Sequence, residues 1–227
     1  MDRGEIIMRR ILAVVALLLT SLLGLPATGG AEVAAEPLGS GAVLFNPLGP
    51  AGHCTAAFAA VDARGLGHLV TEASCANLTS ADLYTTDSSG KNVLVGSVVS
   101  AGATYAVVRV RNTAAWELVP WIDTGTGRVV LTGSRETPAG GTVCLVDRPA
   151  AMSCGRVLLR DDPDGPAPGL TRTDLCASPE SVAFITADQA QGVPVSASSW
   201  CTTIAGTSWF APVNPILEHE QLSLLTG

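Results

Sequence analysis

Positive charge is scarce in this sequence of 227 residues. Lysine and arginine together number 13, with Lys91 as the single lysine, against 20 aspartates and glutamates, and the formal net charge is −7. Proteins that bind the phosphate backbone of nucleic acids usually present a basic surface, because Lys and Arg make the contacts. The charge balance therefore argues against nucleic acid as a partner.

Long apolar runs are also missing beyond the N-terminus. Two arginines precede an apolar run over residues 11–25, and small residues continue to Ala35. This arrangement is typical of a secretory signal peptide. The run is shorter than the roughly 20 residues that a membrane-spanning helix needs. We therefore predict a signal peptide over residues 1–31, with cleavage after Ala31 or as late as Ala35, and no membrane span in the mature protein.

The spacings that mark metal sites are absent as well. The sequence has no Cys-x-x-Cys or His-x3-His pair, and an even number of cysteines in an exported chain indicates disulfides instead. The six cysteines are Cys54, Cys75, Cys144, Cys154, Cys176 and Cys201, and their spacing alone leaves the pairing open. Asp161, Asp162 and Asp164 could supply oxygen ligands to calcium, but prolines interrupt them and no later Glu closes the loop. We expect a solvated loop there, no metal and no cofactor.

Helical periodicity is confined to the C-terminus. Elsewhere, short apolar runs alternate with Gly, Pro, Asp, Asn and Ser, which is typical of an all-β sandwich or barrel. The expected strands cover residues 42–45, 55–61, 68–71, 93–99, 105–110, 128–132, 141–145, 155–159, 183–186, 193–197 and 208–211. At the end we expect a short helix over about 214–225, with Asn214 as its cap and Pro215 at its first position.

Three segments around the cysteines follow a known pattern. They are His-Leu-Val-Thr-Glu-Ala-Ser-Cys at 68–75, Gly-Thr-Val-Cys at 141–144 with Ser-Cys-Gly-Arg-Val at 153–157, and Cys-Ala-Ser-Pro at 176–179 with Phe-Ala-Pro-Val at 210–213. These segments resemble those of secreted bacterial trypsin-like serine proteases, which have the chymotrypsin fold, of the streptogrisin and α-lytic type. The resemblance covers residues 41–225, nearly the whole mature chain.

The resemblance implies a double antiparallel β-barrel of the trypsin type with a short C-terminal helix. After a flexible lead at 32–40, the homology domain would occupy residues 41–227, with barrel one at about 41–118 and barrel two at about 126–212. The implied disulfides are Cys54–Cys75, Cys144–Cys154 and Cys176–Cys201. We expect the protein to be a monomer.

The residues that carry out catalysis in this family are missing from the matching positions. Ser74, Thr104 and Val182 stand where the resemblance implies the histidine base, the orienting aspartate and the serine nucleophile. A serine hydroxyl does not accept a proton near neutral pH, threonine carries no charge, and valine has no nucleophilic atom. Glu180 also replaces a glycine whose neighbourhood builds the oxyanion hole. We therefore predict an inactive serine protease homologue, a pseudoprotease without catalytic residues.

Two functions from different classes remain open. The first is a binding module that accepts an extended peptide by strand addition. Its binding edge would be Val195, Ser196, Ala197 and Ser198, which match the family's peptide-pairing strand. The second is a hydrolase with displaced groups, in which Ser181 is the nucleophile and His53 or His68 is the base. His68 lies six residues before the position of the base, which favours a structural role for it.

Overall fold

The computed structural model describes residues 34–49, 52–78, 82–195 and 207–227. Contacts divide the chain into two compact units, Met1–Val33 and Ala34–Gly227, and every described residue belongs to the second. The expected signal peptide lies outside the described residues, as do Ser196, Ala197, Ser198 and Cys201. No helix in the described ranges combines the length and the apolar composition that crossing a membrane requires.

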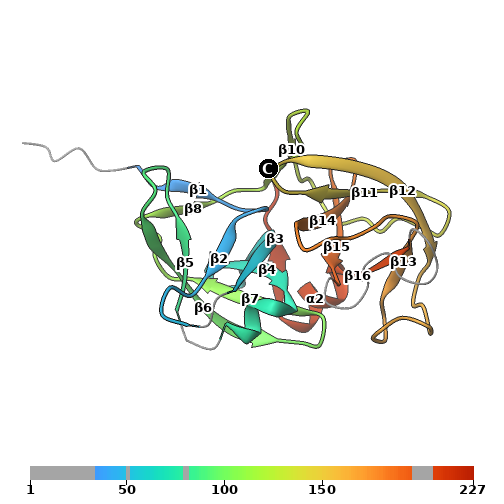
Figure 1. Cartoon of the computed structure of the whole chain (residues 1–227), viewed down its shortest axis with the longest axis horizontal. Helices are drawn as coiled ribbons and strands as arrows, with labels where there is room; N and C mark the ends of the chain where they lie inside the picture. The colour runs from blue at the N-terminus through green and yellow to red at the C-terminus, as the bar shows by residue number, and fades with distance from the viewer. Residues whose placement is uncertain (1–33, 50–51, 79–81, 196–206) are drawn as a thin grey trace, which may run out of the picture. The chain divides into compact units, whose positions relative to one another are not determined.

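Barrel one is a ring of six antiparallel strands, drawn from blue to green in Figure 1. The strands are β2 (Val43–Phe45), β3 (His53–Asp62), β4 (Gly67–Glu72), β5 (Leu83–Thr86), β6 (Asn92–Ala101) and β7 (Tyr105–Val110). Their order is β3–β2–β5–β6–β7–β4, and β4 pairs back with β3. Alternate residues such as Leu69 and Val108 point into the ring and form its apolar interior. Closure leaves no unpaired strand edge in the ring.

Barrel two is a second closed ring, drawn from yellow to red in Figure 1. The strands are β11 (Thr142–Asp147), β12 (Ala151–Leu159), β13 (Thr171–Thr173), β14 (Ser181–Thr186), β15 (Gln189–Pro194) and β16 (Ser208–Pro212). They follow the order β11–β12–β13–β16–β15–β14. Phe184 and Phe210 stack at its centre, with ring centroids 4.6 Å apart. The predicted double antiparallel barrel is confirmed.

Short elements connect and flank the barrels. Strand β1 (Glu36–Leu38) pairs with β8 (Trp116–Leu118), strand β9 (Trp121–Asp123) pairs with β10 (Arg128–Val130), and the 3-10 helix η1 (Ala73–Asn77) follows β4. Strands β5 and β13, like β1, β8 and β9, were not expected from the sequence. Their sequences, Leu-Tyr-Thr-Thr and Thr-Arg-Thr, lack an apolar run, and they are strands because neighbouring strands supply their hydrogen-bond partners.

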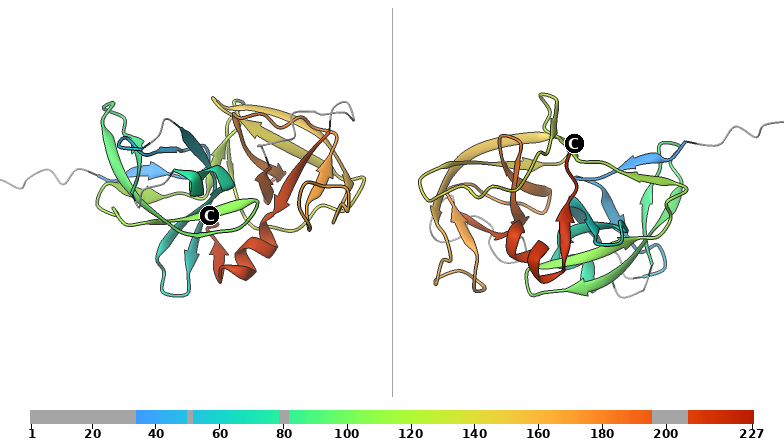
Figure 2. Two further views of the ribbon diagram at one scale, coloured as in Figure 1. Left: turned by 60° about the horizontal axis from the view of Figure 1, so that its bottom comes forward. Right: turned by 180° about the vertical axis from the view of Figure 1, so that it is seen from behind.

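One apolar core joins the two barrels and the C-terminal helix. Its buried members are Ala57, Phe58, Ala60 and Val70 of barrel one, Ile122 and Leu131 of the connection, Val146, Leu170, Val182, Ala183, Ile185, Ala190, Val193, Trp209 and Ala211 of barrel two and the segments beside its strands, and Val213, Ile216 and Leu217 of the helix. Both views in Figure 2 show the red helix α2 (Val213–His219) between the strands of the two barrels. We call this set the inter-barrel core.

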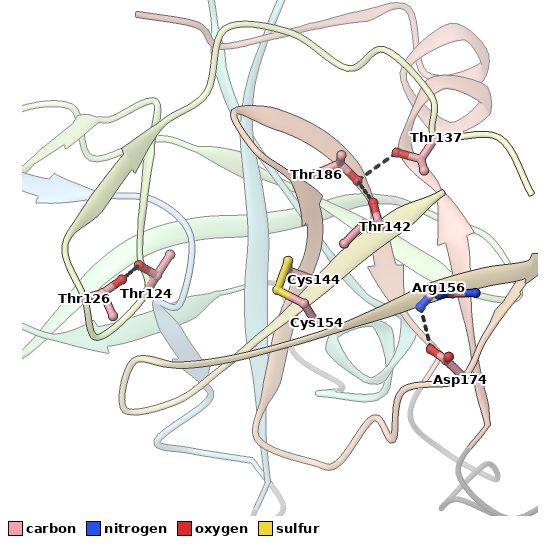
Figure 3. Close-up of a disulfide and its surroundings, with 9 residues drawn as sticks. All are labelled: Thr124, Thr126, Thr137, Thr142, Cys144, Cys154, Arg156, Asp174 and Thr186. Atoms are coloured by element: carbon pink, nitrogen blue, oxygen red, sulfur yellow. Dashed lines mark hydrogen bonds between the residues drawn. A yellow bond between two sulfur atoms is a disulfide. The ribbon is translucent and has the colours of Figure 1, made fainter. Parts of the chain in front are cut away.

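Two of the three expected disulfides lie within the described residues. Cys54 is bonded to Cys75, and Cys144 to Cys154. Figure 3 shows the second bond between β11 and β12, where the two cysteines are direct cross-strand partners. Cys176 is also disulfide-bonded, and its expected partner Cys201 lies outside the described residues. Such bonds typically add about 2–4 kcal/mol each.

The C-terminal segment differs in detail from the sequence expectation. The helix spans Val213–His219, its N-cap residue is Pro212, and Asn214 instead donates a side-chain hydrogen bond to the carbonyl of Ser134. Gln221 has a positive φ of 55°, which ends the helical turn. The predicted helix over 214–225 is therefore too long. Its last part is the strand β17 (Leu222–Leu224), which pairs with β3.

The sequence suggested that the aspartate-rich loop is solvated, but the structure buries one of its aspartates. Asp162 is 1% exposed, and its carboxylate accepts a 2.9 Å hydrogen bond from the indole N–H of Trp209. The guanidinium of Arg172 lies 3.3 Å from the same carboxylate oxygen. Asp162 therefore anchors the loop to barrel two.

A small polar cluster fastens the end of the helix to barrel one. The hydroxyls of Tyr105 and Ser100 donate to Oε1 of Glu220 at 2.7 and 2.8 Å, and His219 Nδ1 lies 3.1 Å from the same oxygen. Burial raises the pKa of Glu220, but these three hydrogen bonds outweigh burial and hold the pKa below its usual value. Burial, with the adjacent Glu220 carboxylate, raises the pKa of Tyr105 to about 12.

Tyr105→Phe should lower the free energy of unfolding by about 1 kcal/mol, because one hydrogen bond to a charged group is lost at a partly exposed site. In the wild type, this contribution should be present below about pH 10 and disappear toward pH 12, since unfolded tyrosine ionises first. Urea unfolding and tyrosinate absorbance measure the two effects. Tyr84→Phe is the matched control, and equal losses in both variants would contradict the prediction.

Candidate functional site

The three residues that the sequence assigns to the triad lie on η1, directly before β7, and on β14. Ser74 lies in η1, which contacts β7, and Thr104 directly precedes β7. Tyr105 packs against the same core that contains Val182. The Oγ atom of Ser74 is buried and has no hydrogen-bond partner among the described residues, and Val182 is 3% exposed. Within this site, the side chain of Val182 serves packing.

The turn over residues 178–181, before β14, satisfies its own backbone groups. The backbone N–H of Ser181 donates to the carbonyl of Ser178 at 3.0 Å, and that of Glu180 donates to Ser178 Oγ at 3.2 Å. The backbone N–H of Ser178 donates to Ser181 Oγ at 2.8 Å. An oxyanion hole needs N–H groups that are free to bind a developing charge. Here the N–H of Glu180, which the resemblance assigns to a glycine of that hole, already has an acceptor.

The hydroxyl of Ser181 is held by a neighbouring carboxylate. Ser181 Oγ donates to Asp147 Oδ1 at 2.6 Å, and Ser181 is 6% exposed. Asp147 is the last residue of β11 and the cross-strand partner of Ser181. The hydroxyl therefore both accepts and donates a hydrogen bond within the fold.

Arg148 connects this turn with barrel one. Its guanidinium donates to the Glu180 carboxylate, and its Nη2 lies 3.2 Å from His53 Nε2 on β3. The Arg148 backbone N–H also donates to the carbonyl of Glu180 at 2.9 Å. Arginine has no acceptor, so Arg148 donates and the ring nitrogen of His53 accepts. We call Asp147, Arg148, Glu180 and Ser181 the polar lock.

None of the three histidines is joined to a serine by a hydrogen bond in the described part of the chain. His53 contacts Arg148, His68 Nδ1 lies 2.9 Å from the carbonyl oxygen of Leu66, and His219 Nδ1 contacts Tyr105 and Glu220. His68 is 6% exposed on β4. The expected structural role of His68 fits this placement. The proposed displaced pairs of Ser181 with His53 or His68 are not brought together.

A cavity of about 290 Å³ lies beside Val182. Apolar side chains, Val182, Ile122 and Val146 among them, line it together with Asp147 and Arg148. The described residues contain no cluster of three side chains that could hold a metal ion. Of the expected binding edge, only Val195 is described, and its backbone N–H donates to the carbonyl of Trp209 at 3.1 Å.

Sequence reasoning missed the polar lock. Asp147 and Arg148 lie in a hairpin between two bonded cysteines, which the resemblance treats as scaffold. The sequence did contain an indication of it. Asp147 and Arg148 are adjacent, oppositely charged residues in a short hairpin closed by a disulfide, and neither charge is needed to form the hairpin. Their partners, Ser181 and Glu180, are distant in sequence, so only the fold identifies them.

The comparisons with known proteins agree with the double-barrel fold. No family model matches the chain. Streptogrisin-C of Streptomyces griseus is 33% identical over 125 residues, which is 52% of this chain and 27% of the relative. Thus the chain spans about a quarter of that relative's length. Nocardiopsis protease has 28% identity and a TM-score of 0.65, covering 84% of this chain and all of that structure. Thermobifida fusca protease A has 25% identity and a TM-score of 0.63, covering 85% and all, respectively.

The chain is similar in sequence and in fold to trypsin-like serine proteases. The fold of this trypsin-like protein extends over both barrels, and the matched structures cover most of the described residues. The disulfides of the trypsin-like domain indicate an oxidising compartment. The assignment of Ser74, Thr104 and Val182 to the triad positions stays a prediction.

Ser181→Ala should lower the free energy of unfolding by about 1–3 kcal/mol, because the Ser178 N–H and the Asp147 carboxylate each lose a partner at a buried position. Urea denaturation monitored by circular dichroism measures the change. Ser223→Ala, on an exposed position of β17, is the control and should change stability by less than about 0.5 kcal/mol. Equal stabilities of the two variants would contradict the structural role of Ser181.

Proposed function

We propose that this chain is an exported, catalytically inactive trypsin-like serine protease homologue that binds an extended peptide or protein segment. The observation that carries the proposal is the turn over residues 178–181, whose N–H groups and hydroxyl are used inside the fold. A serine protease needs a free nucleophile, a base and free oxyanion donors. Val182 and Ser74, at the positions that the resemblance assigns to the nucleophile and the base, supply neither group, and the N–H of Glu180 already has an acceptor.

The loss of activity follows from chemistry at each position. Removal of the nucleophile or the base alone typically lowers turnover about a million-fold. Val182 supplies no nucleophile, and the Ser74 hydroxyl is no base near neutral pH. The Glu180 carboxylate, near the place of the oxyanion, would repel the negative charge of a tetrahedral intermediate.

A second candidate is a hydrolase that uses Ser181 as a displaced nucleophile. The 2.6 Å hydrogen bond from Ser181 Oγ to Asp147 favours it. Among the described residues, the Asp147 carboxylate is the one base that is hydrogen-bonded to the Ser181 hydroxyl. An ordinary aspartate is a weak base for a serine hydroxyl, because its pKa lies far below that of the hydroxyl. The inactive homologue is therefore the better proposal.

Export and binding complete the proposal. The N-terminal run would act as a cleaved signal peptide, and the mature protein would act as a monomer in the disulfide-forming space outside the cytoplasm. An extended peptide would add along Val195, Ser196, Ala197 and Ser198, which the resemblance assigns to the peptide-pairing edge.

A fluorophosphonate probe should leave the folded protein unlabelled, while an active trypsin-like protease treated in parallel is labelled fully. Mass spectrometry of the intact protein measures the labelling. Ser181→Ala serves as the matched control for any weak signal. Stoichiometric labelling of the wild type that disappears in Ser181→Ala would reject the inactive homologue and support the hydrolase.

The proposed peptide binding is tested by exposing the immobilised protein to a library of extended peptides. Peptides that bind should lose at least about tenfold in affinity when alternate backbone amides are N-methylated, since strand addition depends on main-chain hydrogen bonds. Calorimetry of the selected peptides measures this ratio. Unchanged affinity after N-methylation would reject strand addition.

A further inference from the structure

Barrel one carries a second pocket that the proposed function does not use. It has a volume of about 500 Å³ and lies between the β3–β4 hairpin, strands β6 and β7, and the chain that follows α2. The lining residues are Asp62, Ala63, Arg64, His68, Val99, Arg109, Glu220, Gln221 and Leu222. None of them belongs to the polar lock or to the three triad positions.

His68 and Arg109 are neighbours on the outer face of barrel one. They are direct cross-strand partners between β4 and β7, so their side chains leave the sheet on the same side and close together. The preceding pair, Leu69 and Val108, points into the barrel interior. Because residues alternate along a strand, His68 and Arg109 point outward toward the pocket.

Arg109 has no acidic partner in the described part of the chain. No ion pair or hydrogen bond joins its guanidinium to another described residue, although the residue is partly buried. Its nitrogen atoms are absent from the set of buried polar atoms without a partner, so they reach solvent where Arg109 lines the pocket. A guanidinium has five N–H donors and is matched best by a carboxylate, so Arg109 has donors available for a ligand.

The two carboxylates of the pocket are already engaged elsewhere. Asp62 accepts from the backbone N–H groups of Leu66 and Arg64 and from the Arg64 guanidinium. The hydrogen bond from Leu66, with those from Arg64, lowers the pKa of Asp62 to about 2. Glu220 Oε1 accepts from Tyr105 and Ser100. Both acids therefore keep their charge near neutral pH without Arg109.

Apolar atoms form the rest of the lining. A β-bulge between Val98 and Ser100 turns Val99 out of β6, and Val99 is 53% exposed. Leu222 and Ala63 add apolar surface from β17 and the hairpin. A ligand that satisfies both parts of this lining has one anionic group and a short apolar body.

We propose that this pocket binds a small organic carboxylate, with its carboxylate on Arg109 beside His68 and its apolar body against Val99 and Leu222. A planar carboxylate matches the guanidinium fork through two parallel hydrogen bonds. The carboxylates of Asp62 and Glu220 would repel a dianion such as phosphate more than a monocarboxylate. The site shares no lining residue with the cavity beside Val182.

The test is a titration of the ¹⁵N-labelled, disulfide-bonded protein with hexanoate, followed by amide chemical shifts. We expect saturable shifts in β4, β7 and β17 at millimolar concentrations. Hexanamide has the same shape without charge and should cause no comparable shift, and inorganic phosphate should bind more weakly than hexanoate. No saturable shift with hexanoate, or equal binding of hexanamide or phosphate, would overturn the proposal.

Variants then assign the binding to the arginine. Arg109→Gln should weaken hexanoate binding at least about tenfold, because the charge-assisted hydrogen bonds are lost. Arg156→Gln, an exposed arginine on β12 outside the pocket, should bind as the wild type does. Arg109→Lys keeps the charge without the fork and should bind with intermediate affinity. If Arg109→Gln is folded by circular dichroism and binds hexanoate as tightly as the wild type, the assignment to Arg109 is overturned. If that variant does not fold, the comparison of hexanoate, hexanamide and phosphate on the wild-type protein decides the proposal.

Discussion

The two barrels are held together by one apolar core, and Val182 belongs to it. Phe58 and Val70 from barrel one meet Val182 and Ile185 from barrel two, and Ile216 of the helix closes the cluster. The resemblance predicts that Val182 stands where a serine protease presents its reactive hydroxyl. Here a branched apolar side chain removes its surface from water, which favours folding. Val182, at the predicted position of the nucleophile, therefore contributes to the packing between the barrels.

The polar lock beside this core is joined by hydrogen bonds between its own side chains, although Arg148 Nε is buried without a partner among the described residues. Asp147 accepts from Ser181, and Arg148 donates to Glu180 and His53. Such pairing is needed because a polar atom buried without a partner destabilises the fold by about 1–3 kcal/mol. The same pairing removes the donors and acceptors that a substrate would need. The pairing of buried polar atoms therefore explains why the hydrogen-bonded groups of the polar lock are already occupied.

The C-terminal segment links the same two barrels from another side. The helix α2 packs its apolar side into the inter-barrel core, and β17 then pairs with β3 of barrel one. Glu220, between them, accepts the hydroxyls of Tyr105 and Ser100. The pocket around Arg109 is formed where this segment returns to barrel one. Its lining therefore depends on the correct end of the helix at Gln221.

Several features were readable from the sequence because they depend on local patterns. The short apolar runs with turn residues between them predicted β7 at its observed bounds, and the cysteine frames predicted two disulfides that the structure contains. Strands β5 and β13 were missed because their threonines show no apolar alternation, and their pairing comes from neighbours. The helix was drawn too long because Leu222 and Leu224 suit a helical face as well as a strand.

The sequence by itself determined the all-β class and the family resemblance, and it predicts a vacancy at three catalytic positions, since each rests on residue identity at a known spacing. Only the tertiary structure decided what occupies the vacancy. Asp147 and Ser181 are 34 residues apart in sequence, and His68 and Arg109 meet only because β4 pairs with β7. Strand register brings these side chains together, and register is set by packing of the whole barrel rather than by any local segment.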